Sequence, residues 1–136
     1  MNNSELISKA LEARKLSYSP YSGFSVGAAL LCDDGRVYTG CNIENSAYSP
    51  TVCAERTAIF KAVSDGKFNF IKIAVAGSKA EFEIPVNYCP PCGVCRQVMR
   101  EFCDNDFEII MAVSTDNYKV STLSGLLPDS FDISEV

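Results

Sequence analysis

The chain has 136 residues and a formal net charge of −5, and it is 47% apolar and 21% charged, as expected for one globular domain spanning 1–136. An acidic balance without clusters of Lys and Arg argues against a nucleic-acid polymer as a partner. No apolar stretch approaches the ~20 residues that a membrane span needs, and the N-terminus lacks the pattern of a signal peptide. These features predict a cytoplasmic protein with no membrane partner.

The first predicted element is an amphipathic helix over 5–17, where apolar residues recur every three or four positions. Asn3 or Ser4 is available as its N-cap. Two runs of apolar residues follow, 24–32 and 37–41, joined by an Asp-Asp-Gly turn. This arrangement predicts a β-hairpin.

A loop over 42–50 precedes a second predicted helix, which opens at Thr51 or Val52 and ends at an Asp-Gly pair. The other predicted elements are a buried strand at 70–76, a helix from 93 to about 103, a buried strand at 107–113, a short strand at 118–120 and a helical turn at 121–127. Strands that alternate with helices predict an α/β sheet with helices on its faces.

Four residues carry the most specific chemical pattern in the chain. Cys53-Ala-Glu55 is followed, after 35 residues, by Pro-Cys92-Gly-Val-Cys95, and the chain has no histidine. Both motifs fall at predicted helix starts, where partial positive charge favours the thiolate that binds metal. Three sulfur ligands and a carboxylate that need not bind suit a zinc ion with one open coordination position.

Two other uses of these cysteines have to be weighed. A Cys-x-x-Cys pair alone is also compatible with a thiol oxidoreductase or with half of a structural zinc site, but a structural site needs a fourth protein ligand. Cys32, Cys41 and Cys103 lie in predicted strands or at a helix end, where a thiol acts as a small buried apolar group. Cys89, in Cys-Pro-Pro-Cys92, stays open as a possible ligand or oxidisable thiol.

With these motifs, 53–58 (Cys-Ala-Glu-Arg-Thr-Ala) and 91–97 (Pro-Cys-Gly-Val-Cys-Arg-Gln), the chain resembles a cytidine deaminase of the short, homotetrameric kind. The resemblance covers nearly the whole chain. It extends to the segments 18–22, 26–30, 40–45 and 126–128 and to Phe131. It implies a three-layer α/β/α sandwich around a mixed sheet of about five strands.

The resemblance also implies the reaction. Cys53, Cys92 and Cys95 would hold one Zn²⁺ per chain, with water or hydroxide in the fourth position. Glu55 would carry protons from that water to N3 of the pyrimidine and to the departing ammonia while C4 is attacked. Cytidine and deoxycytidine would become uridine and deoxyuridine, a step of pyrimidine salvage.

Further residues receive roles from the same resemblance. Asn42 and Glu44 would hold the ribose hydroxyls, Phe24 would pack on the base, and the backbone of Ala54 would meet the pyrimidine edge. Arg56 would donate hydrogen bonds to the ligand sulfurs and withdraw negative charge from the metal site. Gln97 is a weaker candidate for the same supporting role. Tyr48 and Phe131 would lie at subunit junctions and complete neighbouring active sites.

Two rivals to ordinary cytidine deamination stay open at this stage. One is a deaminase for another aminopyrimidine nucleoside such as blasticidin S, although Phe24, Asn42 and Glu44 favour the ordinary nucleoside. The other is a protein that uses zinc only to fold, in which Glu55 would be dispensable. The ribose-binding residues are compatible with both cytidine and deoxycytidine.

Overall fold

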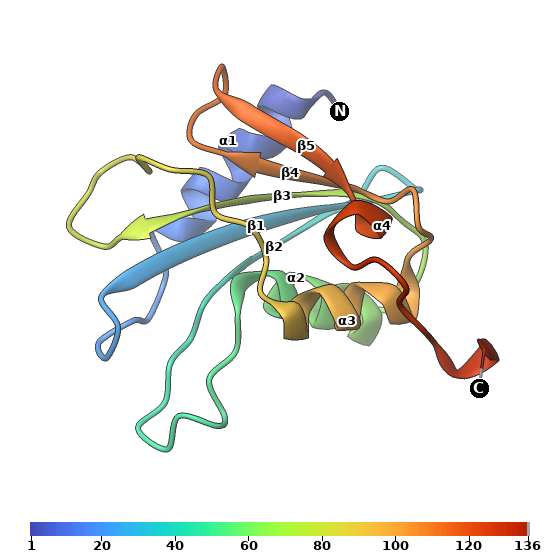
Figure 1. The fold of residues 1–136 in the computed structure, drawn as a ribbon. Helices are drawn as coiled ribbons and strands as arrows, with labels where there is room; N and C mark the ends of the chain where they lie inside the picture. Colours follow the sequence, from blue (N-terminus) through green and yellow to red (C-terminus); the bar gives the residue numbers. More distant parts are fainter. Residues whose placement is uncertain (136) are drawn as a thin grey trace.

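The computed structural model describes residues 1–135, one fewer than the predicted domain, and contains a five-stranded mixed sheet between two layers of helices (Figure 1). The strands are β1 (Phe24–Cys32), β2 (Val37–Cys41), β3 (Phe70–Lys79), β4 (Glu108–Ala112) and β5 (Tyr118–Thr122). Their order is β2-β1-β3-β4-β5; β3 and β4 are parallel, and the other neighbouring pairs are antiparallel. The predicted three-layer fold is confirmed.

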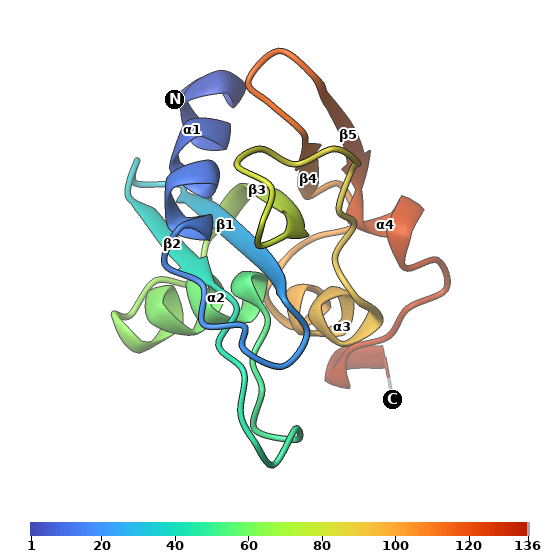
Figure 2. The ribbon, with the colours of Figure 1, turned by 90° about the vertical axis from the view of Figure 1, so that its left-hand side faces the viewer.

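The helices divide between the two faces of the sheet. They are α1 (Asn3–Arg14), α2 (Ala54–Ser64), α3 (Gly93–Phe102), the short α4 (Leu123–Leu126) and the 3₁₀ turn η1 (Ile133–Glu135). Figure 2 shows α1 on one side of the sheet and α2 and α3 on the other. Within residues 1–135, no helix is long and apolar enough to cross a membrane.

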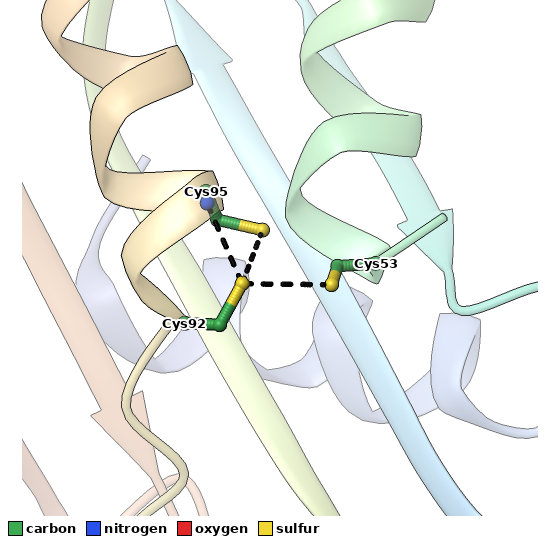
Figure 3. A group of neighbouring side chains, drawn as sticks. All are labelled: Cys53, Cys92 and Cys95. Atoms are coloured by element: carbon green, nitrogen blue, oxygen red, sulfur yellow. Dashed lines mark hydrogen bonds between the residues drawn. The ribbon is translucent and has the colours of Figure 1, made fainter. Parts of the chain in front are cut away.

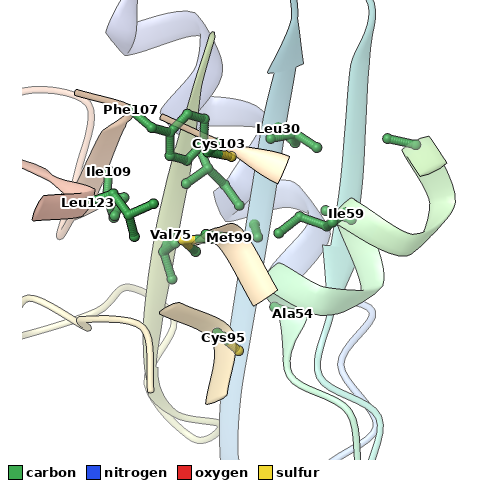
Figure 4. Close-up of a cluster of buried hydrophobic side chains, with 14 of the residues drawn as sticks. Leu30, Ala54, Ile59, Val75, Cys95, Met99, Cys103, Phe107, Ile109 and Leu123 are labelled. Atoms are coloured by element: carbon green, nitrogen blue, oxygen red, sulfur yellow. The ribbon is translucent and has the colours of Figure 1, made fainter. Parts of the chain in front are cut away.

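Each face of the sheet has its own apolar core, because side chains of a strand alternate between the faces. Ala29 and Leu31 of β1 pack with Leu6 and Ile7 of α1. On the other face, Leu30 belongs to a larger cluster with residues of α2 and α3. Figure 4 shows this second cluster, in which Cys95, Met99 and Cys103 follow one another along α3 and its C-cap. Burial of this stripe holds the start of α3 against the sheet.

Two glycines let the helices approach the sheet closely. A Cβ atom at Gly27 would lie 2.0 Å from the carbonyl oxygen of Ala10 in α1. A Cβ atom at Gly40 would lie 2.5 Å from the carbonyl oxygen of Ala54 in α2. Only a residue without a side chain fits such spaces. Gly40 thereby places the first turn of α2 directly on β2.

A buried arginine holds the loop that leads toward α3. Arg14, 7% exposed, donates to the backbone carbonyls of Ser25, Ser78, Lys79, Phe82 and Glu83 and to the hydroxyl of Ser78. These bonds connect the end of α1 to β1 and to the turn after β3. Buried backbone carbonyls need hydrogen-bond partners, and the Arg14 side chain supplies them for this turn.

The structure corrects several predicted boundaries. Helix α1 begins at Asn3, two residues earlier than predicted. Its N-cap is therefore Asn2 rather than Asn3 or Ser4, and Asn2 forms a capping box with Glu5. The helix also ends at Arg14 rather than near 17. Helix α2 begins at Ala54 rather than Thr51 or Val52, because Val52 pairs with Ile43 in an isolated bridge. This long-range contact holds 51–53 extended.

The predicted hairpin is confirmed to the residue, and Gly35 in its turn has a φ of 89°. The other elements are confirmed with shifted ends. Strand β3 continues to Lys79, α3 ends at Phe102, β4 is one residue shorter at each end than predicted, β5 extends to Thr122, and the predicted turn at 121–127 contains α4.

Candidate metal centre and active site

Three cysteine sulfurs meet between the first turns of α2 and α3 (Figure 3). Cys53 is the N-cap of α2, Cys92 is the N-cap of α3, and Cys95 lies one turn into α3. The Sγ atom of Cys92 lies 3.8 Å from that of Cys53 and 3.5 Å from that of Cys95. Cys95 is fully buried, whereas Cys92 is exposed, so the cluster has an inner and an outer side.

The donor set fits a zinc ion. Zinc–sulfur bonds of about 2.3 Å at tetrahedral angles put the sulfurs about 3.8 Å apart. The separations of Cys92 Sγ from the other two sulfurs, 3.8 and 3.5 Å, lie close to this value, and all three sulfurs lie within 4.8 Å of one another. All seven cysteines in the described chain are free thiols, so none of the three is consumed by a disulfide. Cys53, Cys92 and Cys95 therefore offer three of the four positions that zinc uses.

Arg56 supplies positive charge to this cluster. Its Nη2 atom donates to Cys53 Sγ at 3.2 Å. Hydrogen bonding from Cys95 lowers the pKa of Cys53 to about 5, and Arg56 acts in the same direction. Burial opposes the charge of Arg56, but hydrogen bonds to Cys53 and Cys95 raise its pKa above the ordinary value. The arginine thus favours the thiolate form that a metal ligand needs.

Glu55 lies beside the sulfurs, in the first turn of α2, and is 4% exposed. Burial raises the pKa of Glu55 to about 7, and the charge of Cys53 acts in the same direction. A carboxyl group with a pKa near neutrality can both take up and release a proton, which is the property of a general acid and base.

A cavity of about 260 Å³ opens at the sulfur cluster. Its lining contains two groups of functional candidates: Cys53, Glu55 and Cys92, called here the metal end, and Asn42 and Glu44, from the segment after β2, called here the ribose end. The remaining lining residues are Val26, Thr51, Val52, Ala54, Cys89 and Pro90. The structure thus brings the predicted metal, proton-transfer and ribose-binding residues to one cavity.

Three of the six predicted substrate-binding residues lie outside this lining. Phe24 is 40% exposed at the start of β1, and its ring lies beside Gly77, as does the sulfur of Cys89. Tyr48, 73% exposed, lies on the 42–53 loop that Figure 1 shows projecting from the body of the molecule. Phe131, 60% exposed, lies in the C-terminal tail.

Gln97 lies on α3, but its hydrogen bond leads away from the sulfurs. Its Nε2 atom donates to the backbone carbonyl of Phe131 at 3.1 Å. Two arginines of the same helix also hold the tail: Arg96 donates to the carbonyl of Leu126, and Arg100 contacts Asp132. The same helix therefore carries two ligand cysteines and positions the segment that contains Phe131.

Cys89 lines the cavity but is not part of the three-sulfur cluster in the described chain. Burial raises its pKa to about 11, which keeps it a thiol at neutral pH. Cys32 and Cys103 are buried as predicted, whereas Cys41 is half-buried. No sequence pattern indicates that Val26, Thr51, Val52 and Pro90 line the cavity, because their place in the lining depends on how distant segments pack.

Comparisons with known proteins agree with this geometry. The family model for the cytidine and deoxycytidylate deaminase zinc-binding region matches residues 1–111. A cytidine deaminase from Sporosarcina psychrophila is 50% identical over 131 residues, covering 96% of this chain and 92% of its own. A second, from Halalkalibacterium halodurans, is 47% identical and covers 96% of this chain and 95% of its own.

Solved structures give the same result. The crystal structure of cytidine deaminase from Burkholderia pseudomallei matches with a TM-score of 0.87 and 41% identity, covering 96% of this chain and all of the other. That of cytidine deaminase from Mycobacterium tuberculosis matches with a TM-score of 0.82 and 36% identity, covering 98% of this chain and 99% of the other.

Proposed function

The chain belongs to the cytidine and deoxycytidylate deaminase zinc-binding family, and from this premise we propose that Glu55 and the three-sulfur cluster form its reaction centre. The protein is a zinc-dependent enzyme that hydrolyses cytidine to uridine and ammonia. One observation carries the site assignment: a buried carboxyl group stands beside three sulfurs at one end of a cavity, and polar ribose-binding candidates stand at the other. The comparisons do not favour a different aminopyrimidine nucleoside.

The residues divide the chemistry as follows. When bound by Cys53, Cys92 and Cys95, zinc makes water a nucleophile at neutral pH. Glu55 accepts a proton from the attacking water and delivers it to N3 as the C4–O bond forms. It then accepts the proton of the new C4 hydroxyl and delivers it to the amine, so that the C4–N bond breaks and the C4 carbonyl forms. Water and cytidine become uridine and ammonia, and the carboxyl group ends in its starting state.

Arg56 balances the charge of the centre. Three thiolates around a divalent ion leave a net negative charge, which disfavours loss of a proton from water compared with neutral histidine ligands. The contact from Arg56 to Cys53 withdraws part of that charge. We assign Arg56 this supporting role, whereas Gln97, which bonds the tail, is a weaker candidate for it.

The other end of the cavity is proposed to hold the nucleoside. Asn42 and Glu44 bind the ribose, the backbone of Ala54 meets the pyrimidine edge, and Phe24 packs near the base. Since Asn42 and Glu44 offer few free hydrogen-bonding positions, we infer that both cytidine and deoxycytidine are accepted.

We further propose a cytoplasmic homotetramer with one domain per chain, in which Tyr48 and Phe131 complete neighbouring sites. Both aromatic side chains are largely exposed in one chain, and Tyr48 has a φ of 62°, an unfavourable conformation for a bulky residue. Seven free thiols fit a reducing compartment. Light scattering should give four times the 14.8 kDa chain mass; a monomer with full activity would contradict the shared sites.

The decisive experiment combines turnover with metal counting. Purified protein is incubated with cytidine while uridine and ammonia are quantified and zinc per chain is measured. We expect equal amounts of the two products and one zinc per chain. Turnover by a zinc-free protein would refute the metal assignment, and a zinc-loaded protein that leaves cytidine unchanged would refute the activity.

A further inference from the structure

Backbone groups fix the orientation of the Asn42 side-chain amide. The amide N–H of Val26 donates to Asn42 Oδ1 at 2.9 Å, and Asn42 Nδ2 donates to the carbonyl oxygen of Phe24 at 2.8 Å. A backbone N–H can only donate and a carbonyl can only accept, so a flipped amide would lose both bonds. Asn42 therefore enters the cavity in one orientation.

A hydroxyl group completes the surroundings of the same amide. Ser17, in the segment after α1, donates its Oγ hydrogen to Asn42 Oδ1. An amide oxygen has two acceptor positions, and here Ser17 and Val26 occupy both. The NH₂ group has two hydrogens, of which Phe24 takes one. One N–H donor is left for a ligand, and no acceptor.

Glu44 offers a hydrogen-bond acceptor, whereas Asn42 offers a donor. Its Oε1 accepts from the backbone N–H groups of Tyr21 and Ser22, at 3.0 and 3.1 Å, and its Oε2 accepts from the Ser22 hydroxyl. The Ser22 hydroxyl lowers the pKa of Glu44, and the backbone bonds act in the same direction. An ionised carboxylate can only accept, so Glu44 offers an acceptor position on Oε2 in the cavity that Asn42 also lines.

We propose that Ser17 is a positioning residue for the substrate. It occupies the last acceptor position of Asn42 and helps to hold the amide, so that only an N–H donor faces a ligand in the cavity that Glu44 also lines with an acceptor. A donor and an acceptor in one cavity fit a sugar hydroxyl. The inference rests on the proposed function, because it takes the ribose as the ligand of this end of the cavity. Ser17 touches no ligand and acts through Asn42.

The contacts of Ser17 favour this role over a purely structural one. Its hydroxyl contacts Asn42 Oδ1 and, at 3.3 Å, the hydroxyl of Ser19. A hydroxyl has a single hydrogen, and the Asn42 contact is the shorter. Ser19 in turn contacts Ser25 at 3.2 Å and does not reach Asn42 directly. Removal of the Ser17 hydroxyl therefore affects mainly the hydrogen bonding of the Asn42 amide.

The test compares Ser17→Ala with wild type on two substrates, cytidine and 2′,3′-dideoxycytidine, which lacks both sugar hydroxyls at these carbons. We expect the KM for cytidine to rise about fivefold, with kcat unchanged, because the Asn42 amide loses one of the three hydrogen bonds that hold it for the sugar hydroxyl. The kcat/KM for the dideoxy substrate should stay at the wild-type value. Because both substrates meet the same variant, a general loss of stability cancels in the ratio.

Ser19→Ala is the matched control, since it removes a neighbouring hydroxyl but keeps the bond from Ser17 to Asn42. It should leave the ratio between the two substrates at the wild-type value. Equal losses on both substrates, or an unchanged KM for cytidine in Ser17→Ala, would overturn the proposal. Calorimetric binding of uridine and 2′,3′-dideoxyuridine gives the same comparison without turnover, so a failure of the deaminase activity itself is seen separately.

Discussion

The two ends of the cavity are built in different ways. At the metal end, the sulfurs come from two helix starts that are far apart in the sequence, and they meet only because α2 and α3 pack on the same face of the sheet. At the ribose end, Asn42 and Glu44 are held by hydrogen bonds from the neighbouring segment 17–26. Packing of two helices therefore brings the metal-binding candidates together, whereas hydrogen bonds between neighbouring chain segments position the ribose-binding candidates. Changes at the first end should lower kcat, and changes at the second should raise KM.

Metal removal should give the largest effect. A chelator that strips zinc should abolish turnover and lower the thermal unfolding midpoint, because three thiolates would be left together without a cation. An ion present at 1,000 times its dissociation constant stabilises the folded state by about 4 kcal/mol. Added zinc should restore both properties. Full activity in protein shown to be zinc-free would contradict the role of the metal end.

Glu55→Gln should lower kcat by about 10²- to 10⁴-fold, since it removes the proton carrier and keeps the shape of the side chain. The variant should stay folded and hold one zinc, which metal analysis and circular dichroism would verify. Glu101→Gln, on the exposed side of α3, is the matched control and should behave as wild type. If both variants were equally active, zinc would have only a structural role.

Arg56→Gln should lower kcat by roughly 10- to 100-fold, the range for loss of a group that supports metal ligands. The variant loses the hydrogen bond from the guanidinium group to Cys53 Sγ, so negative charge is no longer withdrawn from the sulfurs. Arg36→Gln removes an exposed arginine that pairs with Asp65 and serves as the control. A rise in KM without a change in kcat would place Arg56 in binding instead of charge balance.

Glu44→Gln should act at the other end, raising the KM for cytidine by about tenfold while kcat is preserved, because a charge-assisted hydrogen bond is replaced by a neutral one. Steady-state kinetics measure the two constants separately. Glu81→Gln, an exposed residue after β3, is the control. A fall in kcat with an unchanged KM would contradict the assignment of Glu44 to substrate binding.

Cys89→Ser should have the smallest effect. The cysteine lines the cavity but lies outside the sulfur cluster, so the variant should still bind one zinc per chain. Metal analysis after extensive dialysis provides the measurement. Loss of zinc in this variant would make Cys89 a ligand and would remove the open coordination position that the reaction requires.

Much of the fold could be predicted because local rules decide it. The hairpin was predicted to the residue, since an Asp-Asp-Gly turn between two apolar runs leaves few alternatives. The start of α2 was predicted two to three residues early, because the pairing of Val52 with Ile43 is a contact between distant positions. The buried Arg14 was also missed: on a helical pattern it appears as a solvated last-turn residue.

The groups available for chemistry follow from the sequence: seven thiols, three of them in the two motifs, a carboxylate two residues after Cys53, no histidine, and helix starts that favour thiolates. Tertiary structure alone decided which sulfurs meet, that Cys89 stays apart, and that the oxygen of Asn42 is fully occupied. The physical reason is that residue type sets what an atom can donate, accept or ligate, whereas packing sets the distances and burial on which each of those interactions depends.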